Sequence, residues 1–142
     1  MMPATETIFL VSNDSLLTQQ IDQILFEHFG INTVTLQKNE FAKILFMESP
    51  LFILWDGRSQ TEKDENLLHW LREHLHGKPI VAILDTRIDP SNISWYQRGV
   101  NMFCYTECDL LMDTLSFHTK AILAHHAKKN SSSASTIDRV EV

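Results

Sequence analysis

The feature that most constrains the fold of this chain is an alternation between short apolar runs and longer segments with helical periodicity. Each apolar run has the length of a β-strand, and in the segment that follows it the apolar residues recur every three or four positions. Strands that alternate with helices through short loops form a parallel sheet, because each connection must cross the sheet and return to the same end. The sequence therefore predicts an α/β domain with five parallel strands, at residues 7–12, 32–37, 51–55, 79–84 and 101–106.

The predicted helices carry start and stop signals. The polar stretch SNDS offers N-cap residues before the first helix, and Gly30 stands where a helix commonly ends. Pro50 ends the second helix, and Asp89 with Pro90 provides a cap and a first helical residue for the fourth. The predicted helices cover residues 16–29, 40–47, 62–75, 90–98 and 109–128.

Length and charge limit the class of protein. A chain of 142 residues is long enough for one domain with a single core, which we place at residues 1–129. Residues 130–142 are polar, rich in serine and without periodicity, so we expect a flexible tail or linker, either to a further output domain or at the end of a stand-alone protein. The net charge of -6, with only 12 scattered Lys and Arg residues, argues against direct binding of nucleic acid.

The sequence also lacks a signal for the membrane or for a metal-binding cysteine motif. No apolar run approaches the roughly 20 residues of a membrane span, and the first residues carry no basic segment, so we expect a cytoplasmic protein. Cys104 and Cys108 are too widely spaced for a CxxC pair. Nothing in the sequence indicates that the nearby histidines would be placed to share a metal ion with them. We expect Cys104 to be a buried apolar residue.

Polar side chains stand at the carboxyl ends of the predicted strands, where ligands bind in sheets of this type. Asp56 ends the apolar run FILWD, and a carboxylate there is costly to bury unless it has a partner or a reaction. Asn13 and Asp14 follow the first strand. Carboxylate and amide oxygens from neighbouring loops suit a hydrated Mg²⁺ ion, so Asn13, Asp14 and Asp56 are the candidate metal ligands.

Three motifs, FLVSND, FILWD and GVNMFCYTEC, make residues 7–128 resemble the receiver domain of bacterial two-component response regulators. The resemblance implies a flavodoxin-like fold with strand order 2-1-3-4-5 and a signalling role without enzymatic activity. It also implies that Asp56 accepts a phosphoryl group from a histidine kinase, and that Asn13 and Asp14 correspond to the Mg²⁺-binding pair.

The chain departs from that family at the positions that support phosphorylation. Leu84 stands where the family has a switch hydroxyl, Thr106 where it has a lysine, and Asn13 where it has an acid. We therefore expect Mg²⁺ binding to be weak or absent and phosphorylation to be negligible. The substitutes in the sequence are Arg58 or Arg87 for the positive charge, and Thr86 or Thr106 for the hydroxyl.

Other positions bear on how such a domain would act. Phe103 resembles the aromatic switch residue of the family, and without a hydroxyl at position 84 we expect it to be fixed. Ile93, Trp95 and Tyr96 are predicted to be exposed on the helix at residues 90–98. There they would bind a protein partner or a second copy, through the face formed by this helix, the strand at 101–106 and the helix at 109–128.

The alternative function is a small-molecule-binding or enzymatic domain on the same kind of sheet. The chain has only four glycines, and the first strand is followed by SND rather than by a glycine-rich phosphate loop. No Ser-His-Asp or Cys-His arrangement can be placed from the sequence. These observations favour the signalling module over the alternative.

Overall fold

A computed structural model describes residues 6–58, 61–75, 77–85, 95, 97, 99, 100, 102–107 and 109–141. The strands β1 (Thr7–Val11), β2 (Asn32–Leu36), β3 (Ile53–Asp56), β4 (Ile80–Leu84) and β5 (Met102–Tyr105) pair in parallel. Their order is β2-β1-β3-β4-β5, which confirms the predicted flavodoxin-like architecture. The predictions made for Thr86, Arg87, Ile93, Tyr96 and Cys108 lie outside the described residues.

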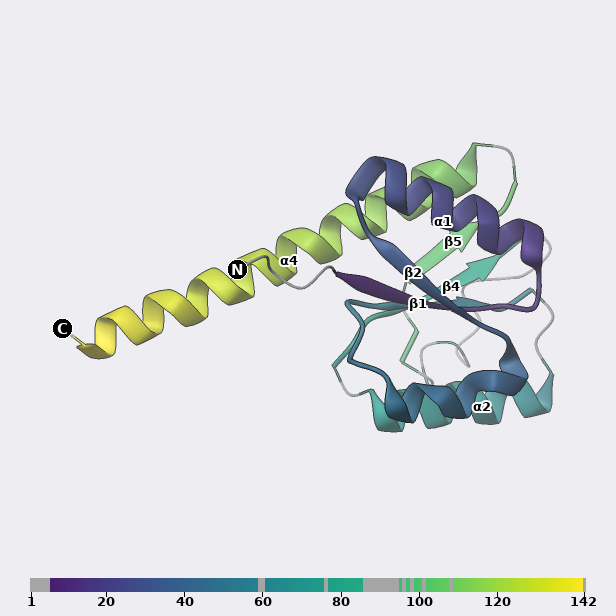
Figure 1. The fold of residues 1–142 in the computed structure, drawn as a ribbon, viewed down its shortest axis with the longest axis horizontal. Helices are drawn as coiled ribbons and strands as arrows, with labels where there is room; N and C mark the ends of the chain where they lie inside the picture. Colours follow the sequence, from purple (N-terminus) through teal and green to yellow (C-terminus); the bar gives the residue numbers. More distant parts are fainter. Residues whose placement is uncertain are drawn as a thin grey trace.

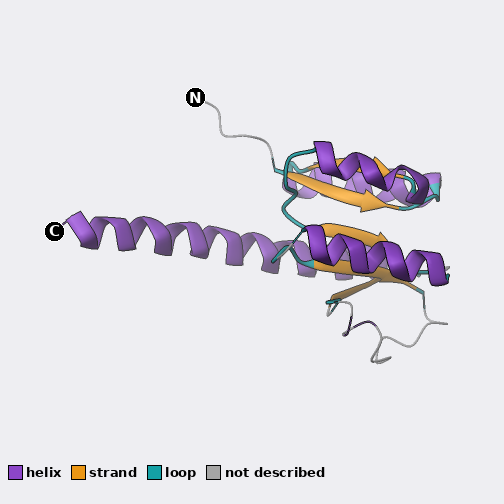
Figure 2. Ribbon diagram, turned by 90° about the horizontal axis from the view of Figure 1, so that it is seen from below, coloured by secondary structure: helices purple, strands orange, loops and turns teal. Residues whose placement is uncertain are grey.

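Helices cover both faces of the sheet (Figures 1 and 2). The helices α1 (Ser15–Phe29) and α4 (Leu110–Glu141) lie on one face, and α2 (Glu62–His74) with the 3₁₀ helix η1 (Lys38–Phe46) lies on the other. Side chains alternate between the two faces along each strand, so each strand contributes to two separate hydrophobic cores. In β3, for example, Leu54 packs in the core under α1 and α4, whereas Ile53 and Trp55 pack in the core under α2.

The second helical segment differs in type from the predicted α-helix. Residues 38–46 form the 3₁₀ helix η1, in which hydrogen bonds span three residues rather than four. The turn is set at its start, where the backbone N–H of Glu40 donates to the carbonyl oxygen of Gln37 at 2.9 Å. The Glu40 carboxylate in turn accepts from the Gln37 backbone N–H at 3.0 Å, so one residue closes the turn in both directions.

The last helix is longer than predicted. α4 runs from Leu110 to Glu141, so residues 130–141, expected to be an irregular tail, have a helical backbone and extend beyond the sheet (Figure 1). Residues 110–141 contain no glycine or proline that would interrupt the helix. Whether this segment serves as a linker stays a prediction.

Trp95 corrects the predicted interface. The sequence predicts an exposed aromatic anchor at this position, but Trp95 is only 5% exposed and packs in the core under α2. Its ring meets that of Phe103 edge to face, with centroids 6.3 Å apart. Gly57 provides the space for it, because a Cβ atom there would lie 2.7 Å from Cη2 of Trp95. The burial of a large indole is favourable, and the prediction of an exposed Trp95 is wrong.

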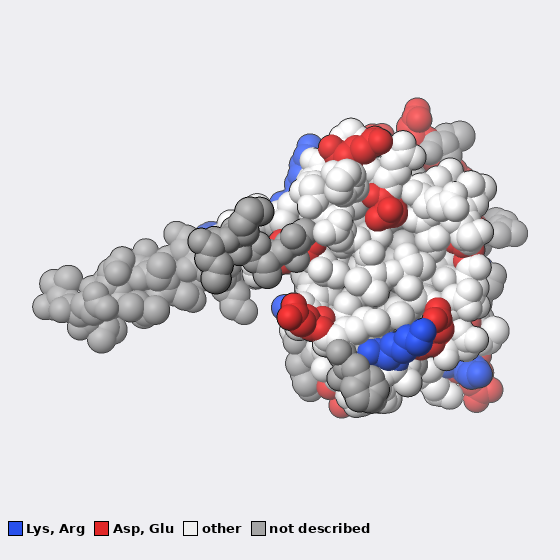
Figure 3. Space-filling model, in the orientation of Figure 1, with Lys and Arg blue, Asp and Glu red and all other residues white. Residues whose placement is uncertain are grey.

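The charged side chains are dispersed over the surface, as the scattered Lys and Arg residues in the sequence predict. On the face seen in Figure 3, acidic and basic side chains are scattered among broad uncharged areas, without a continuous basic patch. Within the described part of the chain, none of the helices combines the length and apolar character that a membrane span requires.

Candidate functional site

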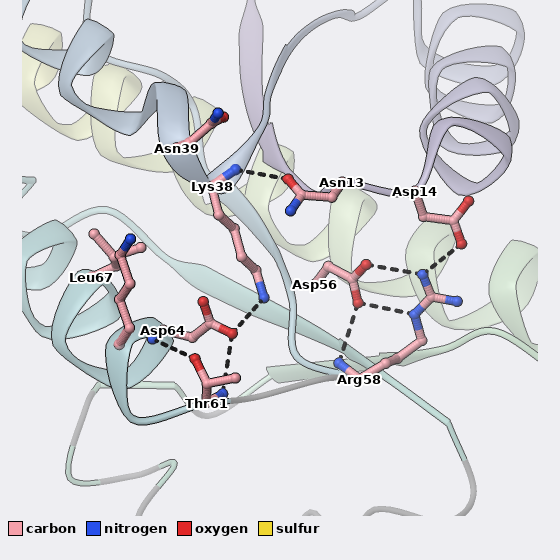
Figure 4. Close-up of a pocket in the computed structure, with 10 residues that line it drawn as sticks. Asn13, Asp14, Lys38, Asn39, Asp56, Arg58, Thr61, Asp64 and Leu67 are labelled. Atoms are coloured by element: carbon pink, nitrogen blue, oxygen red, sulfur yellow. Dashed lines mark hydrogen bonds and ion pairs between the residues drawn. The ribbon is translucent and has the colours of Figure 1, made fainter.

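A polar cavity of about 690 Å³ opens at the carboxyl ends of β1 and β3 (Figure 4). Parallel strands place the residues that follow them at the same end of the sheet, so β1, β2 and β3 each contribute to the wall. The sequence-predicted residues Asn13, Asp14 and Asp56 all line it. The full lining is Asn13, Asp14, Lys38, Asn39, Asp56, Arg58, Thr61, Lys63, Asp64 and Leu67.

The Asp56 carboxylate is buried, with 8% of the residue exposed, and both of its oxygens are engaged. Oδ1 accepts from the backbone N–H of Arg58 at 3.2 Å and from Nε of the same residue at 2.9 Å. Oδ2 accepts from the Ser12 hydroxyl at 2.7 Å and from Nη2 of Arg58 at 2.9 Å. A carboxylate offers about four lone-pair positions, so the hydrogen bonds to Asp56 occupy all of them.

Arg58 joins the two acidic side chains of the site. Its guanidinium makes a two-pronged contact with Asp56, and Nη2 also donates to Oδ2 of Asp14 at 2.8 Å (Figure 4). The other oxygen of Asp14 caps α1, because Oδ1 accepts from the backbone N–H groups of Leu16 and Leu17 at 3.0 and 3.1 Å. Arg58, one of the two substitute cations predicted from the sequence, therefore supplies a positive charge at Asp56.

Ser12 is a site residue that the sequence motifs did not single out, because it stands in the polar stretch that predicts a helix cap. Its hydroxyl donates to Asp56 and accepts from the Asp14 backbone N–H at 3.1 Å. The alternation of side chains between the two faces of a strand could have identified Ser12 as a site residue. Leu10 pairs with Leu54 on the face under α1, so two residues further on Ser12 and Asp56 point to that same face.

Asn13 lies in the cavity but turns away from Asp56. Its Oδ1 accepts from the backbone N–H of Lys38 at 2.9 Å, which ties β1 to the start of η1 (Figure 4). Lys38 in turn forms an ion pair with Asp64 at 3.0 Å, and its ammonium lies 5.3 Å from the centre of the Trp55 ring. The other side of the cavity is thus lined by a separate ion pair between Lys38 and Asp64. Asp64 also forms the capping box of α2 together with Thr61.

The electrostatics follow from these contacts. Burial alone would raise the pKa of Asp56, but the donors from Arg58 and Ser12 outweigh it, so its pKa lies below the ordinary value. The hydrogen bond from Arg58 likewise lowers the pKa of Asp14. The two carboxylates raise the pKa of Arg58, so the cluster of Asp14, Arg58 and Asp56 carries two negative charges and one positive charge at neutral pH.

The predicted switch positions Leu84, Phe103 and Thr106 do not line the cavity. Leu84 is fully buried in the core under α2, and its Cδ2 would be 3.1 Å from a Cβ atom at Gly57. Phe103 is half-buried against Trp95. Thr106 follows β5, where its backbone N–H donates to the carbonyl oxygen of Leu84 at 3.1 Å. Leu84, Trp95 and Phe103 therefore belong to the core under α2, and Leu84 and Trp95 lie against Gly57, the residue that follows Asp56.

The donor set does not fit a divalent metal ion as it stands. The space between Asp14 and Asp56, where Mg²⁺ would be coordinated, contains the Arg58 guanidinium, and Asn13 is committed to Lys38. Among the described residues, no three His, Cys, Asp or Glu side chains gather in a way that could hold a metal. Cys104 is buried as expected, and burial raises the pKa of its thiol to about 12.

Comparison with solved structures agrees with this topology. A response regulator from Thermotoga maritima shares 19% sequence identity at a TM-score of 0.69, over 85% of this chain and 99% of that one. The receiver domain of a Francisella response regulator shares 16% identity at a TM-score of 0.68, over 86% and 99%.

A third solved structure comes from a different class of signalling protein. The signal receiver domain of a histidine kinase from Syntrophus aciditrophicus shares 20% identity at a TM-score of 0.68, over 85% of this chain and 92% of that one. No protein-family model and no curated protein sequence matches the chain. The chain therefore has the fold of receiver domains, with a sequence far from these examples.

Proposed function

We propose that this chain is a receiver-like signal-transduction module of the bacterial cytoplasm that acts through protein–protein interaction, without enzymatic activity and without phosphorylation of Asp56 at signalling rates. The observation that carries the proposal is the saturated Asp56 carboxylate, which accepts four hydrogen bonds from Ser12 and Arg58. An oxygen that attacks phosphorus must present a lone pair, and each lone pair of Asp56 already has a donor.

The surroundings of Asp56 also oppose phosphoryl transfer. Such a reaction depends on positioning and on stabilisation of the charge that develops on the phosphoryl oxygens. Leu84 has no hydroxyl at the position where typical receivers carry one, and Thr106 has no positive charge at the position where they carry a lysine. Because the loss of one donor in such a site costs on the order of 100-fold or more in rate, two losses make the reaction negligible.

The experiment is incubation of the purified protein with Mg²⁺ and acetyl phosphate, followed by intact-mass measurement. We expect no phosphoryl adduct, and the Asp56→Asn variant provides the matched blank. A beryllium fluoride titration followed by NMR gives a second measurement that does not require a stable phosphoryl bond. Rapid, stoichiometric modification that is absent from Asp56→Asn would show that the site is live and the proposal wrong.

The interaction surface that we propose lies on α4 beside the edge strand β5, and it corresponds to the predicted face without Trp95. Three large apolar side chains of α4 are exposed, with Leu110 41%, Met112 37% and Phe117 69% accessible. His118 connects this helix to the strand, since its Nε2 lies 3.0 Å from the carbonyl oxygen of Phe103. Exposed apolar groups of this kind serve as anchors for a protein partner or a second copy.

A matched pair of variants tests this surface. Phe117 on α4 and Phe26 on α1 are exposed to similar degrees, 69% and 61%. We expect Phe117→Ser to weaken self-association, or capture of a purified histidine kinase, and Phe26→Ser to leave both unchanged. Light scattering coupled to size exclusion and biolayer interferometry measure them, and equal behaviour of the two variants would rule out a specific role for α4.

A further inference from the structure

The sheet has two edge strands, and they differ in how their outer backbone groups are bonded. β2 lies at one end of the strand order and β5 at the other, in front and behind in Figure 1. We propose that the open edge of β2 binds an extended segment of a partner protein, which adds a strand to the sheet and places an arginine or lysine side chain beside Val34. This surface goes beyond the proposed function, because it involves neither Asp56 nor the exposed side chains of α4.

The outer edge of β5 is closed by side chains of α4. The backbone N–H of Thr106 donates to a carbonyl oxygen of β4 at 3.1 Å, so by alternation the backbone groups of Phe103 and Tyr105 point away from β4. The N–H of Tyr105 donates to the hydroxyl of Thr114 at 3.2 Å. Nε2 of His118 donates to the carbonyl oxygen of Phe103 at 3.0 Å. Two residues one turn apart on α4 thus occupy backbone groups that an added strand would need.

The outer edge of β2 is open. The backbone N–H of Asn32 and the carbonyl oxygen of Leu36 bond to residues that flank β1, at 3.4 and 3.0 Å, so by alternation the backbone groups of Thr33 and Thr35 point away from β1. No described residue is hydrogen-bonded to these outward backbone groups. The strand, NTVTL, also contains no charged residue and no proline, which are the usual protection of an exposed edge. It can therefore accept a further strand.

A cavity of about 350 Å³ beside Val34 determines which side chain the added strand needs. Val34 packs against the core under α2, and a side chain at the same level of a paired strand points to the same face. Phe9 and Met47 give the cavity apolar walls, and the exposed residues Glu6 and Glu48 add two carboxylates. Lysine and arginine combine an apolar stem with a charged end, so both match this lining.

The charges around the cavity favour a basic side chain over an acidic one. No described Lys or Arg lines the cavity. Among the described residues Glu48 has no basic partner, and the basic group near Glu6 is the imidazole of His126, with Nε2 3.6 Å from Oε1. An incoming guanidinium or ammonium group would meet two carboxylates, whereas an acidic side chain would be repelled by both. Main-chain hydrogen bonds would supply the affinity, and this cavity the specificity.

The experiment titrates the full chain with the peptide acetyl-Thr-Val-Thr-Arg-Thr-Val-Thr-amide and with the same peptide containing Glu in place of Arg. Calorimetry measures the affinity, and we expect the Arg peptide to bind about tenfold more tightly at low salt. Amide hydrogen exchange followed by NMR locates the site. The amides of Thr33 and Thr35 should exchange quickly in the free protein and slowly in the complex, whereas those of Val34 and Leu36 should be protected in both.

Two pairs of protein variants test the backbone and the charge. Proline at an outward position of an edge strand removes an N–H group without breaking the ladder to the neighbouring strand. Thr35→Pro should therefore stay folded and bind at least about tenfold more weakly, and Thr35→Val, which keeps the N–H group, should bind like the wild-type protein. Glu48→Gln should reduce the preference for the Arg peptide. Glu62→Gln, next to the cavity at the carboxyl ends of the strands, should leave it unchanged.

A modified peptide replaces Thr35→Pro if that variant does not fold. Along an added strand only every second N–H group points to β2. Of two Arg peptides that are N-methylated at alternate residues, one should therefore lose binding and the other should keep it.

Four results would overturn the inference: no binding of either peptide at millimolar concentration, equal binding of the Arg and Glu peptides, folded Thr35→Pro that binds like the wild-type protein, or equal binding of the two N-methylated peptides. Slow exchange of Thr33 and Thr35 in the peptide-free protein, lost on dilution, would show that a second copy occupies this edge instead. Phe117→Ser should bind the Arg peptide like the wild-type protein, so this test and those of the proposed function succeed or fail separately.

Discussion

Replacing Gly99 with alanine tests how the structure joins α2 to the segment that leads into β5. Gly99 has a φ of +82°, which a residue with a Cβ atom rarely adopts. A Cβ atom at this position would also lie 2.4 Å from Nε of Arg72. Arg72 donates from Nη1 to the carbonyl oxygen of Lys78 at 3.0 Å and from Nη2 to that of Gly99 at 3.2 Å. The substitution therefore strains the backbone and displaces the side chain that ties two loops together.

The expected magnitude comes from a comparison with Gly77. Gly77 has a similar φ of +73°, but no atom of the described residues lies within 4 Å of the position that an alanine methyl group would take, so Gly77→Ala carries only the cost of the left-handed conformation. That cost is about 1–2 kcal/mol. Gly99→Ala adds the loss or distortion of two hydrogen bonds from a half-buried guanidinium, together about 2 kcal/mol. We expect Gly99→Ala to lose about 3–4 kcal/mol of unfolding free energy.

Urea denaturation followed by circular dichroism measures these differences, provided that the dependence on urea is the same for all variants. In an Arg72→Ala background the side chain that blocks the methyl group is gone, so Gly99→Ala should cost only as much as Gly77→Ala. Equal losses for Gly99→Ala and Gly77→Ala in the wild-type background would refute the reasoning, and so would an unchanged cost of Gly99→Ala in the Arg72→Ala background.

Three further predictions concern pH and helix capping. Because the pKa values of Asp14 and Asp56 are lowered from 3.8 in the folded state, their stabilising effect is complete above that pH and is lost as the pH falls through the folded values, and acid unfolding curves should show this loss. Burial lowers the pKa of His118 below 6.5, so the folded state binds fewer protons than the unfolded state and stability should fall as the pH drops below 6.5. In His118→Gln, the midpoint of urea unfolding should depend less on pH below 6.5 than in the wild-type protein. An unchanged dependence would show that His118 is not the cause. Thr61→Ala removes the N-cap of α2 and should cost about 1 kcal/mol in urea denaturation, whereas no loss would show that Asp64 suffices for the cap.

The sequence determined the architecture because secondary structure depends on residues close together in the chain. The spacing of apolar residues placed each described strand within a few residues of its observed bounds, and the unbroken run 51–55 marked β3 as a strand buried on both faces. The carboxyl ends of the strands then placed Asp14 and Asp56 at one edge. The sequence also allowed Ser12 to be predicted as a site residue. Side chains along β1 alternate between the two faces of the sheet, and this alternation places Ser12 on the same face as Asp56.

Tertiary structure decided the partners of those residues. The hydrogen bonds from Ser12 to Asp56 and from Arg58 to Asp14 each join positions 44 residues apart, so they exist only once β1 and β3 are neighbours. The direction of a long side chain such as Arg58 is a choice among rotamers that the local sequence leaves open, and only the two facing carboxylates select it. The burial of Trp95 has the same origin, because the space that it fills is created by Gly57, far earlier in the sequence and at the end of β3. Local periodicity thus specified where the site lies, and the long-range contacts of Ser12 with Asp56 and of Arg58 with Asp14 specified how its side chains are paired.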